Sequence, residues 1–188
     1  QVSLLLDFRG SNMSVASACA TSGHALGEAA ASITRNDADV MLAGGAESTV
    51  TPLAIGAFAQ MRALSTRNDA PAKASRPYDK DRDGFVLSEG AVVFLLEERE
   101  HALRRGARIY AELCGYGASA DAYHLSSLAP GAEGSARAMR AALARAKLAP
   151  SDVDYVSAHA TSTPGGDGEE ATAIAEVFAA NKADLNVS

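Results

Sequence analysis

Residues 17–25 read SACATSGHA and join a strand-like run over residues 13–18 to a helical run over residues 20–35. The stretch places Cys19 at a strand-to-helix turn, near the unpaired N–H groups and the positive end of the helix dipole. That position makes a cysteine sulfur a better nucleophile, and the small neighbouring residues leave room above it. Taken alone, however, a free cysteine is more often buried and inert. The stretch by itself therefore leaves both interpretations open.

Outward from this turn, strand-like and helix-like segments alternate, which predicts an α/β fold. The expected strands are 2–6, 13–18, 39–45, 91–97, 109–113 and 155–158. The expected helices are 20–35, 51–61, 98–105, 133–147 and 169–181, with a long loop over 67–83. The helix at 133–147 is amphipathic, with one apolar stripe formed by Ala136, Met139, Leu143 and Ala146. A boundary near Arg108 divides the chain into two α/β domains, 1–108 and 109–188.

Composition excludes several classes of protein. The chain has 188 residues with a net charge of −6, which argues against a nucleic-acid-binding protein with a broad basic face. No apolar run is long enough to predict a membrane span. Two cysteines far apart form no disulfide framework and suit a reducing compartment, so we expect a cytoplasmic location, with plastid and mitochondrion left open. Because the chain begins at Gln1 inside strand-like sequence, we expect both ends to be cut from a longer polypeptide.

A second stretch, SAHATSTPGGDGEE at residues 157–170, places His159 at the carboxyl end of a strand, where side chains often face a site. Thr161 and Thr163 alternate, so their hydroxyls could point the same way and bind one extended ligand. Asp167 and Glu170 have a local interpretation as the N-cap and N3 residues of the next helix, which can coexist with a functional one. His159 alone could equally be a structural histidine.

Residues 79–84, DKDRDG, imitate the start of a calcium-binding EF-hand loop. The twelfth position of such a loop should be glutamate, but it is Gly90 here, and no helix is expected before the loop. We therefore expect no metal site. We also expect Cys114 to be buried, and His24 to lie too far round the helix to act as a base for Cys19.

Six stretches together resemble the elongating β-ketoacyl-acyl carrier protein synthases, the condensing enzymes of fatty-acid and polyketide synthesis. They are ACATSG (18–23), AGGAE (43–47), RALSTRND (62–69), RPYDKDRDGFV (76–86), DAYH (121–124) and HxTSTPxGD (159–167). The likeness covers nearly the whole chain, in order. It implies a thiolase-like layered α-β-α-β-α architecture, truncated at both ends in this chain.

The resemblance also implies a reaction, a decarboxylative Claisen condensation. Cys19 would be the nucleophile that takes an acyl chain from a carrier-protein thioester, with its own N–H as one oxyanion donor. His159 would be one of two histidines that help decarboxylate malonyl-carrier protein, acting as a neutral hydrogen-bond donor. The resulting carbanion attacks the acyl-Cys19 thioester, which lengthens the chain by two carbons.

Other residues acquire implied roles in substrate binding: Phe58, His124, Ser126, Thr161 and Thr163. Phe58 would line the acyl pocket, and His124 and Ser126 would lie near the substrate tunnel. Thr161 and Thr163 would hold the phosphopantetheine arm. Because the carrier protein brings that arm, no separate cofactor is expected. The expected partners are acyl carrier protein, acyl and malonyl thioesters, and a second copy of the chain in a homodimer.

Three further residues match positions in the same family. Arg62 matches a position that meets the acidic carrier protein. Asp167 and Glu170 match an acidic pair near the active-site lysine. The sequence departs from the family at Ala160, where glycine is usual. If this position needs a positive φ, the added methyl strains it.

The family's lysine and second histidine are expected beyond Ser188, so we expect this chain alone to be inactive. Other interpretations are a type II polyketide ketosynthase and a non-catalytic structural or dimerisation fragment of the same fold. A thiolase acting on coenzyme A esters should lack the HxTSTP loop. A papain-like cysteine protease would allow the 140 positions between Cys19 and His159, but its local signature and any tryptophan are absent.

Overall fold

The computed structural model describes residues 1–125, 127–181 and 184–188. The chain folds into two compact units. The first unit comprises residues 1–47 and 90–113, and the second comprises residues 48–89 and 114–188. The chain thus crosses between the units three times. In the described part of the chain, no helix is long and apolar enough to cross a membrane.

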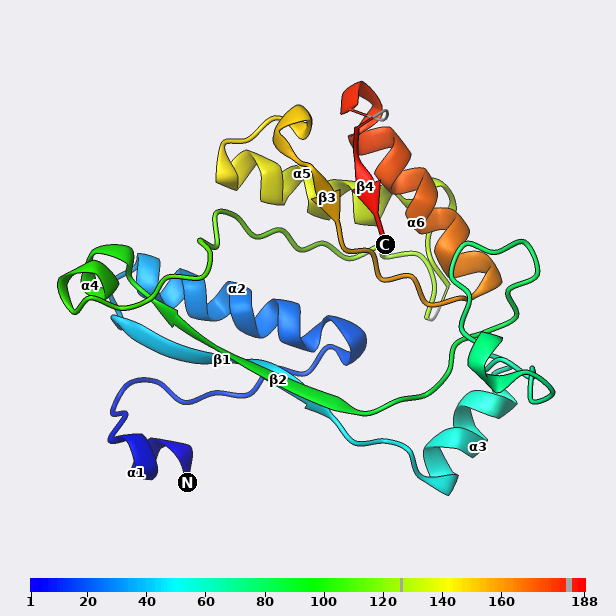
Figure 1. The fold of residues 1–188 in the computed structure, drawn as a ribbon, viewed down its shortest axis with the longest axis horizontal. Helices are drawn as coiled ribbons and strands as arrows, with labels where there is room; N and C mark the ends of the chain where they lie inside the picture. The colour runs from blue at the N-terminus through cyan, green and yellow to red at the C-terminus, as the bar shows by residue number, and fades with distance from the viewer. Residues whose placement is uncertain (126, 182–183) are drawn as a thin grey trace. The chain divides into compact units, whose positions relative to one another are not determined.

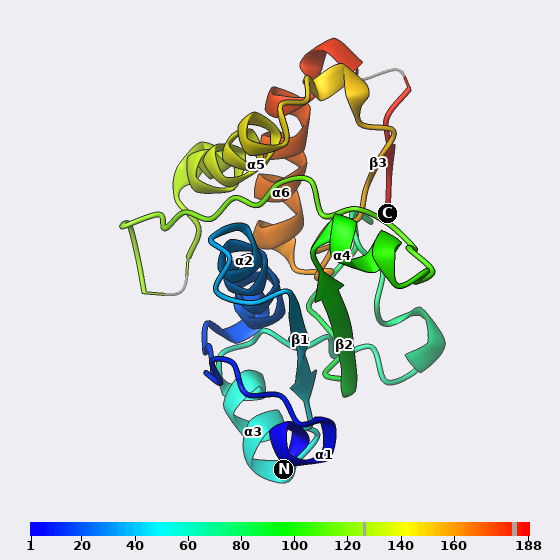
Figure 2. The same cartoon turned by 90° about the vertical axis from the view of Figure 1, so that its left-hand side faces the viewer.

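The first unit is built on a two-stranded antiparallel sheet. Strand β1 (Val40–Glu47) pairs with β2 (Gly90–Glu97), with Val40 opposite Glu97 and Glu47 opposite Gly90 (Figure 1). Helix α2 (Thr21–Thr34) lies along β1 (Figure 2). The two short helices are α1 (Val2–Leu6) and α4 (Arg99–Arg104).

Glycine allows the beginning of α2 to approach β1 closely. A Cβ built on Gly45 would overlap the Ser22 side chain, and one built on Gly44 would overlap the Val92 carbonyl. A larger residue at Gly44 would push against the backbone of β2, and one at Gly45 would displace the Ser22 side chain. Gly45 therefore allows α2, which follows the Cys19 turn, to pack closely on the sheet.

Four expectations for the first unit are wrong. Residues 2–6 form helix α1 rather than a strand. A run as short as VSLLL cannot be assigned to helix or strand by periodicity alone. Residues 13–18 and 109–113 form no strand, since neither has a hydrogen-bonded strand partner among the described residues. Strand 91–97 is confirmed as β2, but it is exposed rather than buried, because α2 packs mainly on β1.

In its described residues, the second unit contains three α-helices and a short parallel sheet. Its helices are α3 (Pro52–Gln60), α5 (Glu133–Ala146) and α6 (Pro164–Val177). Its strands are β3 (Tyr155–Val156) and β4 (Asn186–Val187), with Tyr155 opposite Asn186. One-turn 3-10 helices lie between these elements at Pro71–Lys73, Pro130–Ala132, Pro150–Asp152 and Ala179–Asn181.

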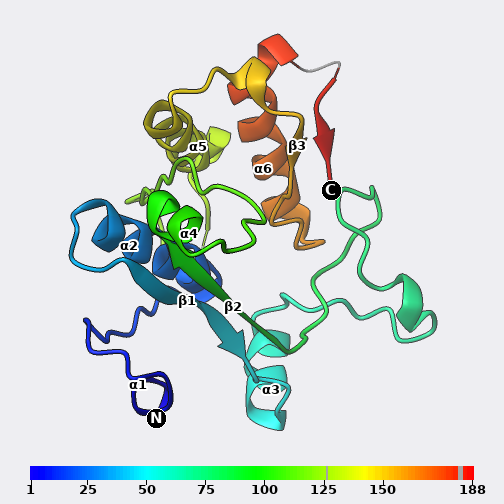
Figure 3. The ribbon, with the colours of Figure 1, turned by 60° about the vertical axis from the view of Figure 1, so that its left-hand side comes forward.

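The core of the second unit lies between α5 and α6, which pack side by side (Figure 3). Its buried members are Ala132, Ala136, Ala173, Ile174, Val177 and Phe178. Met139 and Leu143 pack against them, which confirms the apolar stripe predicted for α5. Val156 of β3 packs on the same cluster, so the core fixes the strand that leads directly into His159. Cys114 is exposed, contrary to expectation.

Candidate active site

Cys19 lies in a one-turn 3-10 helix, Ala18–Ala20, that runs directly into α2. Its side chain is exposed. The preceding residue, Ala18, has a φ of 50°, a left-handed conformation that is rare for residues with a Cβ. Such outliers persist where the surrounding structure enforces them. This left-handed residue turns the chain sharply just before the cysteine.

Two hydrogen bonds fix the Cys19 turn. The Ser17 amide donates to Thr21 Oγ1 over 2.9 Å, and the Ala20 amide donates to the Ser17 carbonyl over 3.1 Å. His24 Nδ1 contacts Ser17 Oγ. Within the described residues, the Cys19 amide donates no backbone hydrogen bond, so it remains available to an oxyanion.

His159 follows β3 and is exposed, and its backbone is tied to helix α6. The His159 amide donates to Glu170 Oε1 over 2.7 Å, and the Ala160 amide donates to Glu170 Oε2 over 2.9 Å. The Tyr78 hydroxyl donates to the same Oε2 over 2.8 Å. Glu170 therefore acts as an anchor for the histidine loop, and its predicted role as an N3 capping residue is wrong.

The hydroxyl oxygens of Thr161 and Thr163 lie 2.9 Å apart and hydrogen-bond to each other, so they lie side by side; that they bind a ligand stays a prediction. Thr163 is the N-cap of α6, with its Oγ1 accepting from the Gly166 amide over 3.2 Å. Asp167 is not the N-cap as predicted, because α6 begins at Pro164, five residues earlier than expected. Proline at the first helical position and the threonine cap start the helix there.

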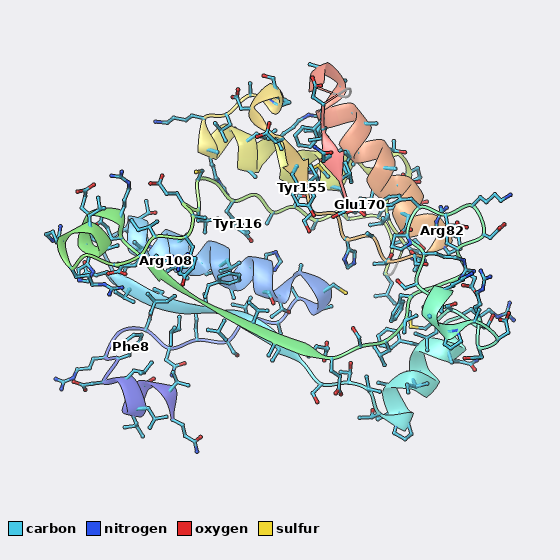
Figure 4. All side chains as sticks on the ribbon, in the orientation of Figure 1. Phe8, Arg82, Arg108, Tyr116, Tyr155 and Glu170 are labelled. Atoms are coloured by element: carbon cyan, nitrogen blue, oxygen red, sulfur yellow. The ribbon has the colours of Figure 1, made fainter. Side chains whose placement is uncertain are left out.

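Asp167 is a buried carboxylate at the centre of this region, 1% exposed. Its Oδ2 accepts from the Tyr78 amide over 2.8 Å, and its Oδ1 accepts from Thr161 Oγ1 over 3.3 Å. Arg82 Nε lies 3.5 Å from Oδ2 and also donates to the Thr163 carbonyl over 3.0 Å. Figure 4 labels Arg82, which lies on the loop before β2, and Glu170, which lies on α6.

Residues 76–84 together form a clasp over the histidine loop. The Arg76 amide donates to Ser162 Oγ over 3.0 Å, and the Gly84 amide donates to the Ser162 carbonyl over 2.9 Å. Ser162 is fully buried with a φ of 63°. The clasp therefore holds the loop in a conformation that a non-glycine residue rarely adopts.

The carboxylate of Asp83 belongs to the same clasp. It accepts from Ser65 Oγ over 2.7 Å, from the Thr66 amide over 3.0 Å, and from Arg76 over 2.9 Å. The hydrogen bond from Ser65 is the main cause of a lowered pKa for Asp83, followed by that from Thr66. The residues that imitate a calcium loop thus have structural partners within the protein.

The remaining predicted site residues of the second unit lie in other places. Phe58 packs edge-to-face against Phe85, with ring centroids 5.2 Å apart. Arg62 is exposed, with a φ of 55°. His124 is exposed, and its Nδ1 accepts from the Ser127 amide over 3.1 Å. Ser126 lies outside the described residues.

Sequence reasoning gave no role to Tyr78, Arg76, Arg82 or Ser162, although all four lie in stretches that carry the resemblance. The one sequence feature that could have pointed to the first three of them is the polar, proline-containing loop over residues 67–83. Its partners lie more than 80 positions away along the chain, so no local pattern identifies them.

Two known family models match the chain. The chain matches the model of the beta-ketoacyl synthase N-terminal domain over residues 1–102 and that of the C-terminal domain over residues 110–188. These matches define the class of this protein as the ketosynthases. The chain belongs to the beta-ketoacyl synthase family.

Individual relatives carry related names. A "3-oxoacyl-[acyl-carrier-protein] synthase 2" from Coxiella burnetii is 54% identical over 100% of this chain and 45% of its own length. A mitochondrial "3-oxoacyl-[acyl-carrier-protein] synthase" from Arabidopsis thaliana is 53% identical over 94% of this chain and 39% of its own. The chain thus spans less than half the length of these relatives.

Solved structures confirm the thiolase-like α/β fold. A beta-ketoacyl synthase from Burkholderia phymatum superposes with a TM-score of 0.89 at 44% identity, covering 94% of this chain and 43% of that one. A chain of the structure described as "AntDE:AntF (apo): type II PKS acyl-carrier protein in complex with its ketosynthase bound to the hexaketide" gives a TM-score of 0.95 at 38% identity. That match covers 99% of this chain and 46% of that one.

Proposed function

We propose that the complete gene product containing these residues is a 3-oxoacyl-[acyl-carrier-protein] synthase. The observation that carries this proposal is the exposed Cys19, placed at the N-terminal end of α2 by a left-handed Ala18. A thiol at such a position has an amide beside it for an oxyanion and open space for a thioester. The names of the similar relatives support the same activity.

The reaction begins with acyl transfer to Cys19. Its Sγ attacks the acyl thioester carbonyl of an acyl carrier protein, and the phosphopantetheine thiol leaves with a proton. Malonyl-carrier protein then loses CO2, and the resulting carbanion attacks the acyl-Cys19 carbonyl. The cysteine sulfur departs, which leaves a 3-oxoacyl thioester two carbons longer on the carrier. The covalent intermediate implies ping-pong kinetics.

His159 serves the decarboxylation step in this proposal. Its neutral imidazole donates a hydrogen bond to the malonyl thioester carbonyl, where enolate charge develops. Glu170 accepts hydrogen bonds from the backbone amides of His159 and Ala160, so the backbone that carries the imidazole has a defined position. The family's second histidine and its lysine are not among these 188 residues, so the chain expressed alone should not condense substrates.

The proposed partner is an acyl carrier protein, whose phosphopantetheine arm makes a separate cofactor unnecessary. In this proposal Thr161 and Thr163, whose hydroxyl oxygens lie 2.9 Å apart, would contact that arm, and the exposed Arg62 would meet an acidic carrier surface. Phe58 would line the acyl pocket, with His124 beside the tunnel. We also propose a homodimer and a cytoplasmic location. A mitochondrial location is the alternative, because one similar relative is named as mitochondrial.

A type II polyketide ketosynthase is the second candidate, because the AntDE ketosynthase superposes over nearly the whole chain. The two activities differ in their products. A fatty-acid enzyme releases one elongated 3-oxoacyl chain per condensation, whereas a polyketide enzyme retains and extends an unreduced poly-β-keto chain.

The test incubates the purified complete gene product with acyl-carrier protein and malonyl-carrier protein and follows products by mass spectrometry. We expect CO2 release and a 3-oxoacyl-carrier product two carbons longer, abolished by Cys19→Ala and by His159→Ala. A Cys19→Ala protein that still extends chains would refute the proposal. Any 3-oxoacyl product from the 188-residue chain alone would contradict its expected inactivity.

A further inference from the structure

Tyr78 bridges two carboxylates on one face of α6. Its backbone amide donates to Asp167 Oδ2 and its hydroxyl donates to Glu170 Oε2, each over 2.8 Å. The two acidic residues are three positions apart, which places them on the same side of the helix. Tyr78 itself has a φ of 62°. This left-handed conformation aligns one tyrosine with both carboxylates and is held by the bond to Asp167.

The hydroxyl of Tyr78 completes the set of donors around Glu170. Oxygen Oε1 accepts from the His159 amide, and Oε2 accepts from both the Ala160 amide and the Tyr78 hydroxyl. Three donors on one partly exposed carboxylate leave it a single orientation. Without the hydroxyl, the Glu170 side chain gains freedom to rotate toward water and release the two amides.

We propose that Tyr78 is a positioning residue for His159, acting through the carboxylate of Glu170. The tyrosine is not itself catalytic, because its hydroxyl is occupied by Glu170 rather than by substrate. Its effect belongs to the step that uses His159. The inference therefore rests on the proposed function, which assigns decarboxylation to His159 and acyl transfer to Cys19.

The electrostatics of Tyr78 are consistent with this role. Burial raises the pKa of Tyr78 well above its usual value, and the hydrogen bond to Glu170 raises it further. The phenol therefore stays protonated at neutral pH and keeps its proton for Glu170. A phenolate at this place would face the carboxylates of Glu170 and Asp167 and repel both.

Tyr78→Phe in the complete gene product tests the proposal, because it removes the hydroxyl and keeps the ring and the backbone bond to Asp167. Tyr110→Phe is the matched control, since the Tyr110 side chain is highly exposed and stacks under Arg108 in the first unit. We expect malonyl decarboxylation to fall about tenfold in Tyr78→Phe, the loss expected for one hydrogen bond to a charged group. The rate of Cys19 acylation should stay unchanged, and the control should match the unmodified protein in both steps.

A second readout does not depend on activity. In protein labelled with ¹⁵N-histidine, the His159 amide resonance reports its hydrogen bond to Glu170. We expect this resonance to move upfield in Tyr78→Phe, toward the position it takes in Glu170→Gln, and to remain in place in Tyr110→Phe. This signal can be read at a temperature below the unfolding transition of each variant.

The double variant Tyr78→Phe/Glu170→Gln separates a shared path from two independent effects. If Tyr78 acts through Glu170, the double variant decarboxylates malonyl-carrier protein no more slowly than Glu170→Gln alone. The inference would be overturned if the fold-losses in decarboxylation rate of the two single variants multiplied in the double variant. It would also be overturned if the His159 amide resonance did not move in Tyr78→Phe, or if Tyr78→Phe slowed acylation as much as decarboxylation. An unmodified protein that neither acylates nor condenses would instead refute the proposed function, and the amide resonance would still test the positioning contact.

Discussion

Replacing Ala160 by glycine should stabilise the protein, although glycine substitutions usually destabilise. Ala160 directly follows His159 and has a φ of 47°, in the left-handed region. Its Cβ lies close to the following carbonyl oxygen in that conformation, at a cost of about 1–2 kcal/mol. Glycine removes this strain. The Ala160 amide keeps its hydrogen bond to Glu170, because only the side chain changes.

The size of the gain follows from two opposing terms. Glycine loses more backbone freedom on folding than alanine, which costs about 0.5–1 kcal/mol. Relief of the strain exceeds this cost, so Ala160→Gly should raise the free energy of unfolding by about 0.5–1 kcal/mol. Ala129→Gly is the control, because Ala129 has a φ of −65° and no strain to release. It should lower the free energy of unfolding by about the same amount.

Urea denaturation of the complete gene product, followed by circular dichroism, measures both variants. Ala160→Gly should move the midpoint to higher urea and Ala129→Gly to lower urea, with unchanged slopes. The opposite signs of the two changes in the free energy of unfolding decide the test. Both variants gain the same backbone flexibility in the unfolded chain, so they should differ only through the native φ at the substituted position. If Ala160→Gly lowers the free energy of unfolding as much as Ala129→Gly does, Ala160 carries no conformational strain and the reasoning is refuted.

Three other changes test single contacts, at the buried Asp167, at Gly84 and at Glu97. Asp167→Asn should lower the free energy of unfolding by about 3 kcal/mol in a denaturation titration, because a buried amide mismatches the donors that now surround a carboxylate. Gly84→Ala should cost about 2–4 kcal/mol in the same titration, since Gly84 has a φ of 147° and a Cβ there would lie 2.6 Å from the Ala63 carbonyl oxygen. The hydrogen bond from Arg105 lowers the pKa of Glu97 to about 2, so the stability that Glu97 contributes is present above its ordinary pKa and is lost as the pH falls toward 2. Melting temperatures measured from pH 6 to pH 3 should therefore fall less steeply in Glu97→Gln than in the unmodified protein, and equal slopes would contradict this assignment.

Much of the fold was predictable because local patterns decide it. Helices α2 and α5 follow from long periodic or small-residue runs, and the α5 stripe packs as expected. The start of α6 at Pro164 was not predictable from residues 165–168, whose glycines indicate a loop. There the Thr163 cap and distant contacts from Arg82 stabilise the first helical turn. Tertiary contact outweighs local propensity at this point.

Local sequence motifs identify some residues of the candidate site, and only tertiary contacts identify the others. Cys19 and His159 could be chosen from motifs, and the structure supplies the condition stated for strain at Ala160, a positive φ. Tyr78 could not be chosen, because its hydroxyl meets Glu170 across 92 positions of sequence. Only the folded chain brings these two residues together. The roles of the predicted substrate-binding residues stay predictions.

The mass of the acylated protein tests the central claim most directly. The complete gene product is incubated with acyl-carrier protein alone, without malonyl-carrier protein, and its peptides are analysed by mass spectrometry. We predict one acyl adduct on the peptide that contains Cys19, retained in Cys114→Ser and absent from Cys19→Ala. An adduct on Cys114, which is also exposed, or an adduct that survives Cys19→Ala would contradict the assignment of Cys19 as the nucleophile.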